Sequence, residues 1–142
     1  MALRIEDYAL IGDTHAAALV GYDGSIDWLC LPRFDASACF AAILGTPDNG
    51  RWLLAPSGAA RATKRRYVDD SLVLETTWET PSGTVRVTDF MPPRTVEPDI
   101  YRIVEGISGA VPMRTELVLR FDYGRLVPWV RKIGPDTVAV SG

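Results

Sequence analysis

Short apolar runs separated by turn residues recur along most of the chain, and this pattern constrains the fold more than any other feature of the sequence. The clearest case is the run 16–20, the turn Tyr22-Asp23-Gly24-Ser25 and the run 26–31. An Asp-Gly pair between two apolar runs is the strongest short-range signal for a β-hairpin, because the central residues of a type I′ turn need positive φ. Pro32 then ends the second strand, because proline has no amide proton to continue the ladder.

Later segments follow the same rule. Val85 and Val87 alternate with Arg86 and Thr88, which is typical of an antiparallel strand with one buried and one solvated face. Pro81-Ser82-Gly83 has the composition of a hairpin turn just before this run. We expect further strands at 51–55, 65–68, 72–79, 84–90, 101–107, 114–121, 127–133 and from 137 onward.

The segment 35–44 departs from the strand pattern. Asp35 or Ser37 suits a helix N-cap, apolar residues recur at helical spacing, and Gly45 stands where a left-handed C-cap belongs. We therefore expect one short helix here. Many strands and one helix predict a mainly β fold, an antiparallel β-sandwich with one short helix, in one domain covering 1–142.

The last strand signal, 138–142, has no later run that would close its sheet. Because unpaired edge strands promote association, we expect an incomplete part of a larger domain that forms a homo-oligomer when it is produced alone. In the preceding run, Leu117, Leu119 and Phe121 alternate with polar residues and are expected to face a core.

Composition excludes several partners. The chain has 142 residues and a formal net charge of −3, whereas a nucleic-acid surface needs an excess of Lys and Arg. The one basic cluster, Lys64-Arg65-Arg66, is interpreted as a solvated strand edge. No run is long enough to span a membrane and no signal peptide is recognised. Cys30 and Cys39 lie in apolar surroundings and are expected to be free thiols, which makes the cytoplasm the expected compartment.

Residues with catalytic potential are few. One His and two Cys, far apart, predict no metal site, and no phosphate-binding glycine motif predicts a cofactor. His15 is interpreted as a polar strand residue, because no nucleophile elbow accompanies it. Glycoside hydrolysis needs a pair of carboxylates across a sugar-sized gap. The candidates are Asp23, Asp27, Asp35, Asp89 and Asp122, of which the first suits a turn and the third a cap.

The N-terminal quarter carries a more particular pattern. The segments 5–13, 17–20 and 23–35 resemble the start of bacterial glycoside hydrolase family 15 proteins, the glucoamylase-like and trehalase-like enzymes. Further similar segments are 50–52, 89–92 and 120–125. The resemblance implies a β-sandwich followed by a linker and an (α/α)6 barrel that holds both catalytic glutamates. It therefore implies that the barrel of the same parent chain is the partner and that this chain holds no catalytic residue.

The resemblance also implies that one loop of this domain approaches the mouth of the barrel, and the best candidate is 32–35. Arg33 can fork onto sugar hydroxyls and Phe34 can stack on a pyranose ring, with Asp35 beside them. These three are the candidate substrate-binding residues. The alternative is structural: Phe34 packs against the predicted helix, Arg33 pairs with an acid, and Asp35 caps the helix.

Three hypotheses for the function remain. The first is a structural and interface domain of a hydrolase acting on α-glucosides, which braces the barrel and lends one loop to its rim. The second is a free-standing carbohydrate-binding module, and the third is a small independent hydrolase. Trp28 is interpreted as core and Trp129 as core or domain interface rather than as sugar-binding platforms.

Overall fold

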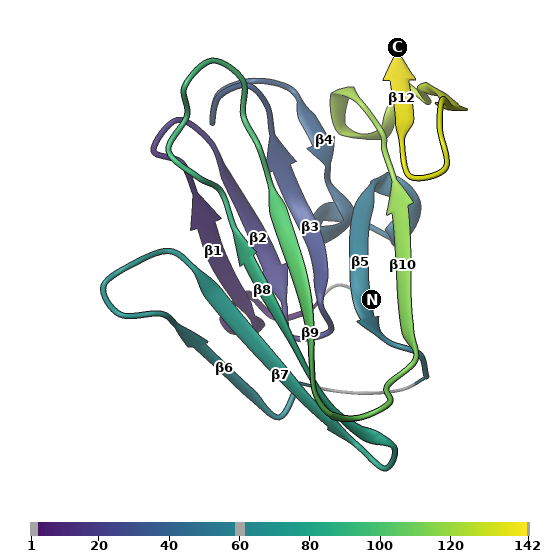
Figure 1. The fold of residues 1–142 in the computed structure, drawn as a ribbon. Coiled ribbons are helices and arrows are strands. Elements are labelled where there is room, and N and C mark those ends of the chain that lie inside the picture. The colour runs from purple at the N-terminus through teal and green to yellow at the C-terminus, as the bar shows by residue number, and fades with distance from the viewer. Residues whose placement is uncertain (1–2, 59–61, 142) are drawn as a thin grey trace.

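The computed structural model describes residues 3–58 and 62–141 and shows two antiparallel sheets packed face to face (Figure 1). The first sheet has the order β1 (Tyr8–Gly12), β2 (Ala17–Gly21), β3 (Ser25–Cys30), β5 (Arg51–Pro56) and β10 (Met113–Val118), with β4 (Ala38–Phe40) paired to β3. The second has the order β6 (Lys64–Tyr67), β7 (Leu74–Thr80), β8 (Gly83–Phe90) and β9 (Tyr101–Gly109). A separate hairpin joins β11 (Trp129–Lys132) and β12 (Val138–Ser141). The predicted fold class is confirmed.

The hairpin predicted at Asp23-Gly24 joins β2 and β3, but its turn is not type I′. Gly24 alone among the turn residues takes a positive φ, 80°, and its amide donates to the Gly21 carbonyl at 3.0 Å. Leu19 pairs with Trp28 and Val20 with Ile26, so Asp27 is an extra residue at a β-bulge. A bulge re-aims the side chain that it carries, which matters for the pocket described below.

The hairpin between β7 and β8 turns through Pro81-Ser82 as predicted, with Thr80 paired to Gly83. Val85 and Val87 are buried against the first sheet, whereas Arg86 and Thr88 face the other side of β8. The period-2 prediction for this strand is therefore confirmed.

The helix predicted at 35–44 is wrong. Residues 38–40 form β4, which lies beside β3 with Phe40 opposite Leu29, and 42–44 form a single 3-10 turn, η2 (Ala42–Leu44). Gly45 has a φ of −166°, which is extended backbone and not a left-handed cap. A short apolar run suits a buried strand as well as a buried helix, and here the free edge of β3 supplied the hydrogen-bond partners that decided it. The remaining 3-10 turns are η1 (Ile5–Asp7), η3 (Pro47–Asn49) and η4 (Asp122–Gly124).

The core fills the space between the sheets. Its largest fully buried apolar side chains are Trp78, Ile11, Ile26, Leu74, Val20 and Val87, drawn from both layers. A smaller cluster of Cys30, Ala38 and Ala41 packs with half-buried Trp28. Trp129, in contrast, is 83% exposed.

One buried ion pair connects the layers. The Arg102 guanidinium on β9 donates to both carboxylate oxygens of Asp89 at 2.8 and 3.2 Å, and both side chains are 1% exposed. The same guanidinium donates to the main-chain carbonyls of Trp52 at 2.6 Å and Gly24 at 2.8 Å, both in the opposite layer. Arg102 therefore holds the second sheet to β5 and to the β2–β3 turn.

The end of β10 differs from expectation in one respect. Leu119 and Phe121 pack against the core as predicted, but Leu117 is 45% exposed. Leu117 lies directly opposite Trp52 in the β5–β10 pair, so it shares the inward face of the sheet. In the part of the chain that the structure describes, no helix is long and apolar enough to cross a membrane.

Candidate functional site

Three loops meet at the upper end of the sandwich in Figure 1, where β1, β3 and β8 end. They are the β1–β2 turn (13–16), the loop after β3 (32–35) and the segment after β8 (91–94). The first two are joined by a main-chain bond, in which the Phe34 amide donates to the His15 carbonyl at 3.0 Å. We call the residues Thr14, His15, Arg33, Phe34 and Asp35 the rim site, because together they line one open pocket of about 440 Å³.

A buried ion pair supports the rim site from below. The Asp13 side chain is fully buried, and its Oδ1 accepts the amides of His15 at 2.9 Å and Ala16 at 2.8 Å. Its Oδ2 accepts Arg94 Nε at 2.8 Å, and Arg94 Nη1 reaches the Pro32 carbonyl at 2.5 Å. Burial raises the pKa of Asp13, but the two amides and the guanidinium outweigh it and leave the pKa below its ordinary value. Asp13 and Arg94 thus fix the three loops relative to one another.

The three predicted substrate-binding residues stand out from this support. Phe34 is 60% exposed, and the side chains of Arg33 and Asp35 are 70% and 74% exposed. Arg33 Nε donates to Asp35 Oδ1 at 3.0 Å, a bond that lowers the pKa of Asp35. The acid partner expected for Arg33 is therefore confirmed. The structural roles expected for the other two are wrong, because residues 35–44 form no α-helix for Phe34 to pack against or for Asp35 to cap.

His15 and Arg94 are the residues of this region that sequence reasoning missed. His15 lies in the β1–β2 turn and is exposed, so its interpretation as a polar strand residue is wrong. Gly12-Asp13 between two apolar runs was the available turn signal. Arg94 lies 62 residues from Pro32 in a proline-rich loop, and only the fold brings it there.

The rim site can recognise a ligand but is not arranged to cleave one. An exposed aromatic ring offers its face to a sugar ring, and a guanidinium with a carboxylate offers donors and acceptors to hydroxyls. The His15 Nδ1 lies 3.4 Å from Thr14 Oγ1 and 3.4 Å from the Asp13 carbonyl oxygen. Glycoside hydrolysis needs two opposed carboxyl groups, and Asp35 is the one carboxylate among the five side chains that line this pocket.

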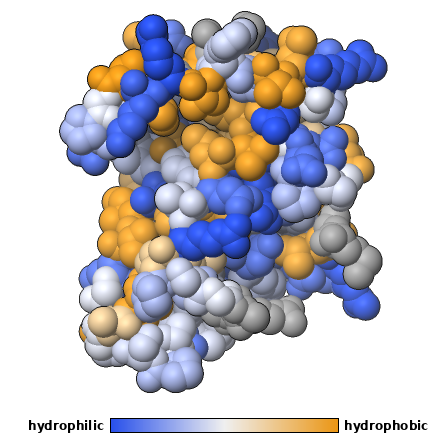
Figure 2. Space-filling model, turned by 90° about the vertical axis from the view of Figure 1, so that its right-hand side faces the viewer, coloured by the Kyte–Doolittle hydropathy of each residue, from blue (hydrophilic) through white to orange (hydrophobic). Residues whose placement is uncertain are grey.

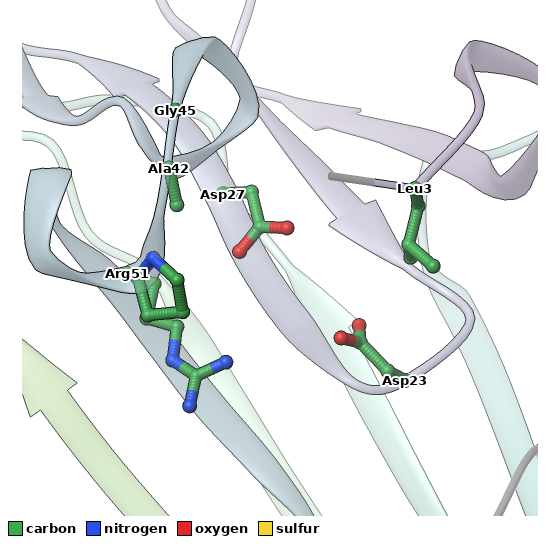
Figure 3. Close-up of a pocket in the computed structure, with 7 residues that line it drawn as sticks. Leu3, Asp23, Asp27, Ala42, Gly45 and Arg51 are labelled. Carbon is green, nitrogen blue, oxygen red and sulfur yellow. The ribbon is translucent and has the colours of Figure 1, made fainter. Parts of the chain in front are cut away.

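The remaining candidate carboxylates lie elsewhere. Asp23 and Asp27 line a different pocket of about 190 Å³, with Arg51 on its far wall (Figure 3). Asp27 is 7% exposed and accepts Ser25 Oγ at 2.5 Å and Tyr8 Oη at 2.7 Å. Burial, reinforced by the negative charge of Asp27, raises the pKa of Asp23.

The polar side chains of the second pocket are bound to neighbouring side chains of the same fold. Burial, together with the hydrogen bond to Asp27, also raises the pKa of Tyr8, so that hydroxyl stays a donor. Arg51 Nη2 binds Glu116 Oε1 at 2.7 Å, and Asp89 is held by Arg102 in the core. Among residues 3–58 and 62–141, no group of three or more His, Cys, Asp or Glu is placed to hold a metal ion.

The known proteins that the chain resembles are trehalases. The family model described as "Trehalase-like, N-terminal" matches residues 1–142. Trehalases of Mycobacterium tuberculosis and Mycolicibacterium smegmatis are each 34% identical to the chain, over 86% and 92% of its length. A trehalase of Thermoplasma volcanium is 30% identical over 91% of it. The chain spans only about a fifth of the length of these relatives, 21–22%. No solved structure gives a significant match. Since the family model covers every residue, the chain belongs to the trehalase-like N-terminal domain family.

Proposed function

We propose that the chain is the N-terminal sandwich domain, 1–142, of a glycoside hydrolase of family 15 that acts on an α-glucoside, with trehalose as the first candidate. Its partner is the catalytic barrel of the same parent polypeptide, which it braces, and the rim site extends the wall of the active-site mouth. The catalytic acid and base belong to that barrel. Two buried cysteines that are free in this fold suit a reducing compartment, so the proposed location is the cytoplasm.

The observation that carries the proposal is the exposure of Phe34 on a rigid support. An exposed aromatic side chain adds little to the stability of a fold. The backbone that carries Phe34 is nevertheless held in place, because Arg94 binds the Pro32 carbonyl and the Phe34 amide binds the His15 carbonyl. Such preorganisation lowers the entropy lost when a ligand is bound. A loop that served only as a connection between β3 and β4 would not need it.

An NMR titration of the isolated chain with trehalose tests direct sugar contact. We expect amide shifts confined to 14–15 and 33–35, with a dissociation constant in the millimolar range, about −4 kcal/mol, because the rim offers only one wall of a site. Cellobiose, a β-linked disaccharide, serves as the control ligand. Shifts centred on another surface, or none at saturating sugar, would contradict the proposal.

The same titration examines the second hypothesis. A free-standing carbohydrate-binding module has to hold its ligand without a partner domain. Micromolar binding of maltose or a longer α-glucan, about −8 kcal/mol, would therefore favour that class. Exposed Trp129 would then be the first residue to examine for shifts, because it is the largest exposed aromatic side chain.

A further inference from the structure

The two sheets of the sandwich differ in width on one side. The first sheet continues from β3 through β5 to β10, whereas the second ends at β9. Arg102 shows where that edge lies, because its guanidinium donates to the Trp52 carbonyl and sits 5.3 Å from the Trp52 ring. The end of the second sheet therefore lies over β5, and β10 extends beyond it on the right of Figure 1.

Where β10 extends beyond β9, inward-facing side chains of both sheets are open to solvent. Val104 lies opposite fully buried Val87 in the β8–β9 pair, yet it is 45% exposed. Leu117 faces the same inter-sheet space from β10 and is also 45% exposed. Gly106, opposite Val85, has no atom within 4 Å of the position that a Cβ would take. We call the strip formed by Val104, Gly106, Thr115 and Leu117 the open lane. Figure 2 shows this side of the molecule, where apolar side chains are mixed with hydrophilic ones and are more frequent in the upper half.

The backbone beside the lane has one edge without a strand partner among the described residues. β9 has nine residues, and among the described residues it pairs only with β8. One edge of β9 therefore presents a row of amide and carbonyl groups to solvent, next to an apolar floor. A long exposed edge with apolar side chains is a ready template for another strand.

We propose that the open lane accepts one extended strand, supplied by the part of a trehalase-like polypeptide outside the region that this chain matches. The strand pairs with the free edge of β9 and points alternate apolar side chains at Val104, Trp52 and Leu117. The inference rests on the proposed function, in which the domain works inside a longer protein. The relatives are long enough to supply the strand, because the chain covers 21–22% of each.

The extension of the first sheet beyond β9 favours a single strand over a second copy of the chain as the occupant. In a dimer formed by antiparallel pairing of two β9 edges, the first sheet of the second copy would lie in the same layer as the first sheet of this chain. That layer is already filled past β9 by β5 and β10. An isolated strand needs no room in that layer, so it fits where a whole sandwich does not.

Peptides from the relatives test the proposal. Overlapping peptides of about 15 residues, enough for one strand with flanks, are made from the unmatched parts of the three trehalases named above. Binding to this chain is followed by fluorescence polarisation, and amide exchange locates the bound peptide. We expect at least one peptide to bind and to slow exchange in 103–107 by about tenfold or more.

A matched pair of variants checks the face of β9 that is used. Val104→Lys places a charge in the lane and should abolish binding, as should Leu117→Lys from the opposite wall. Ile103→Lys is the control, because Ile103 is 51% exposed but lies opposite Thr88 on the outer face of β9. Circular dichroism of each variant shows that the fold is kept.

Three results would overturn the proposal. These are no peptide binding at about 1 mM, protection centred on another strand, and a dimer in sedimentation whose β9 amides are protected. The trehalose titration reports on the rim site, whose residues lie in the β1–β2 turn and in the loop after β3, and it is read separately. The open-lane proposal can therefore be refuted while the rim-site proposal is supported, and the reverse.

Discussion

Replacing Arg102 with methionine should destabilise the domain more than any change to a surface ion pair. Methionine keeps much of the side-chain volume but removes the charge, which leaves the Asp89 carboxylate in the core without its partner. Both side chains are 1% exposed, so water cannot take over the lost bonds. Breaking a buried pair in this way costs about 3–5 kcal/mol. The total stability of a domain is about 5–15 kcal/mol, so the loss is a large fraction of it.

Urea unfolding followed by tryptophan fluorescence measures the loss. With a slope of about 2 kcal/mol per M for a small domain, the midpoint of Arg102→Met should fall by about 2 M. Arg86→Met is the matched control. Its guanidinium is 34% exposed and reaches Glu75 and Glu105 at 3.6 and 3.4 Å on the solvent side of β8, so it should cost less than about 1 kcal/mol.

A double variant separates the lost charge pair from lost packing. Arg102→Met with Asp89→Leu removes the unpaired carboxylate, so it should recover a substantial part of the stability that the single change loses. If Arg102→Met costs no more than Arg86→Met, the ion pair does not hold the two layers together and this reasoning is refuted.

Three further outcomes follow from local geometry. Gly24→Ala should lower the melting temperature and cost at least about 1 kcal/mol, because φ is +80° and a Cβ would lie 2.4 Å from the Leu54 carbonyl; an unchanged melting temperature would contradict it. The lowered pKa of Asp13 means that its carboxylate stabilises the fold above the ordinary value of 3.8, and this stability is lost as the pH falls through the lower folded pKa. Asp13→Asn should therefore weaken the domain at neutral pH and flatten its acid sensitivity, as urea titrations between about pH 3 and 7 would show; parallel curves for the two proteins would count against it. Burial raises the pKa of Cys30 and Cys39, so iodoacetamide should label them slowly in the native state and quickly in urea, and rapid native labelling would argue that the thiols are accessible.

The strands that sequence patterns predicted well were those whose side chains alternate or whose turns contain glycine or proline. β8 is the best example, because Val85 and Val87 point inward as period 2 requires and the preceding turn supplies the reversal. The β2–β3 hairpin was predicted equally well, although its turn type depends on the close approach of Gly24 to the Leu54 carbonyl in β5. That close approach is a tertiary contact and has no local signal.

The errors came where tertiary pairing decided the outcome. The segment 38–42 is apolar at every position because the fold buries all five residues, and such a run carries no period. β1 was not predicted as a strand. The loop 32–35 was identified through the resemblance and by its residue types, whereas His15 and Arg94 join it only through the fold.

Kinetics of a hybrid enzyme test most directly the claim that the rim site meets substrate. The hybrid carries this chain in place of the matching part of the Mycolicibacterium smegmatis trehalase, and its hydrolysis of trehalose is measured. Stacking on an aromatic ring is worth about 0.5–1.5 kcal/mol, so Phe34→Ala should raise KM roughly 2- to 10-fold with kcat nearly unchanged. Phe34→Trp should keep KM low. Leu44→Ala, which truncates a side chain that is 68% exposed and lies outside the rim site, should change neither constant. A KM for Phe34→Ala equal to that of the unaltered hybrid would contradict the account.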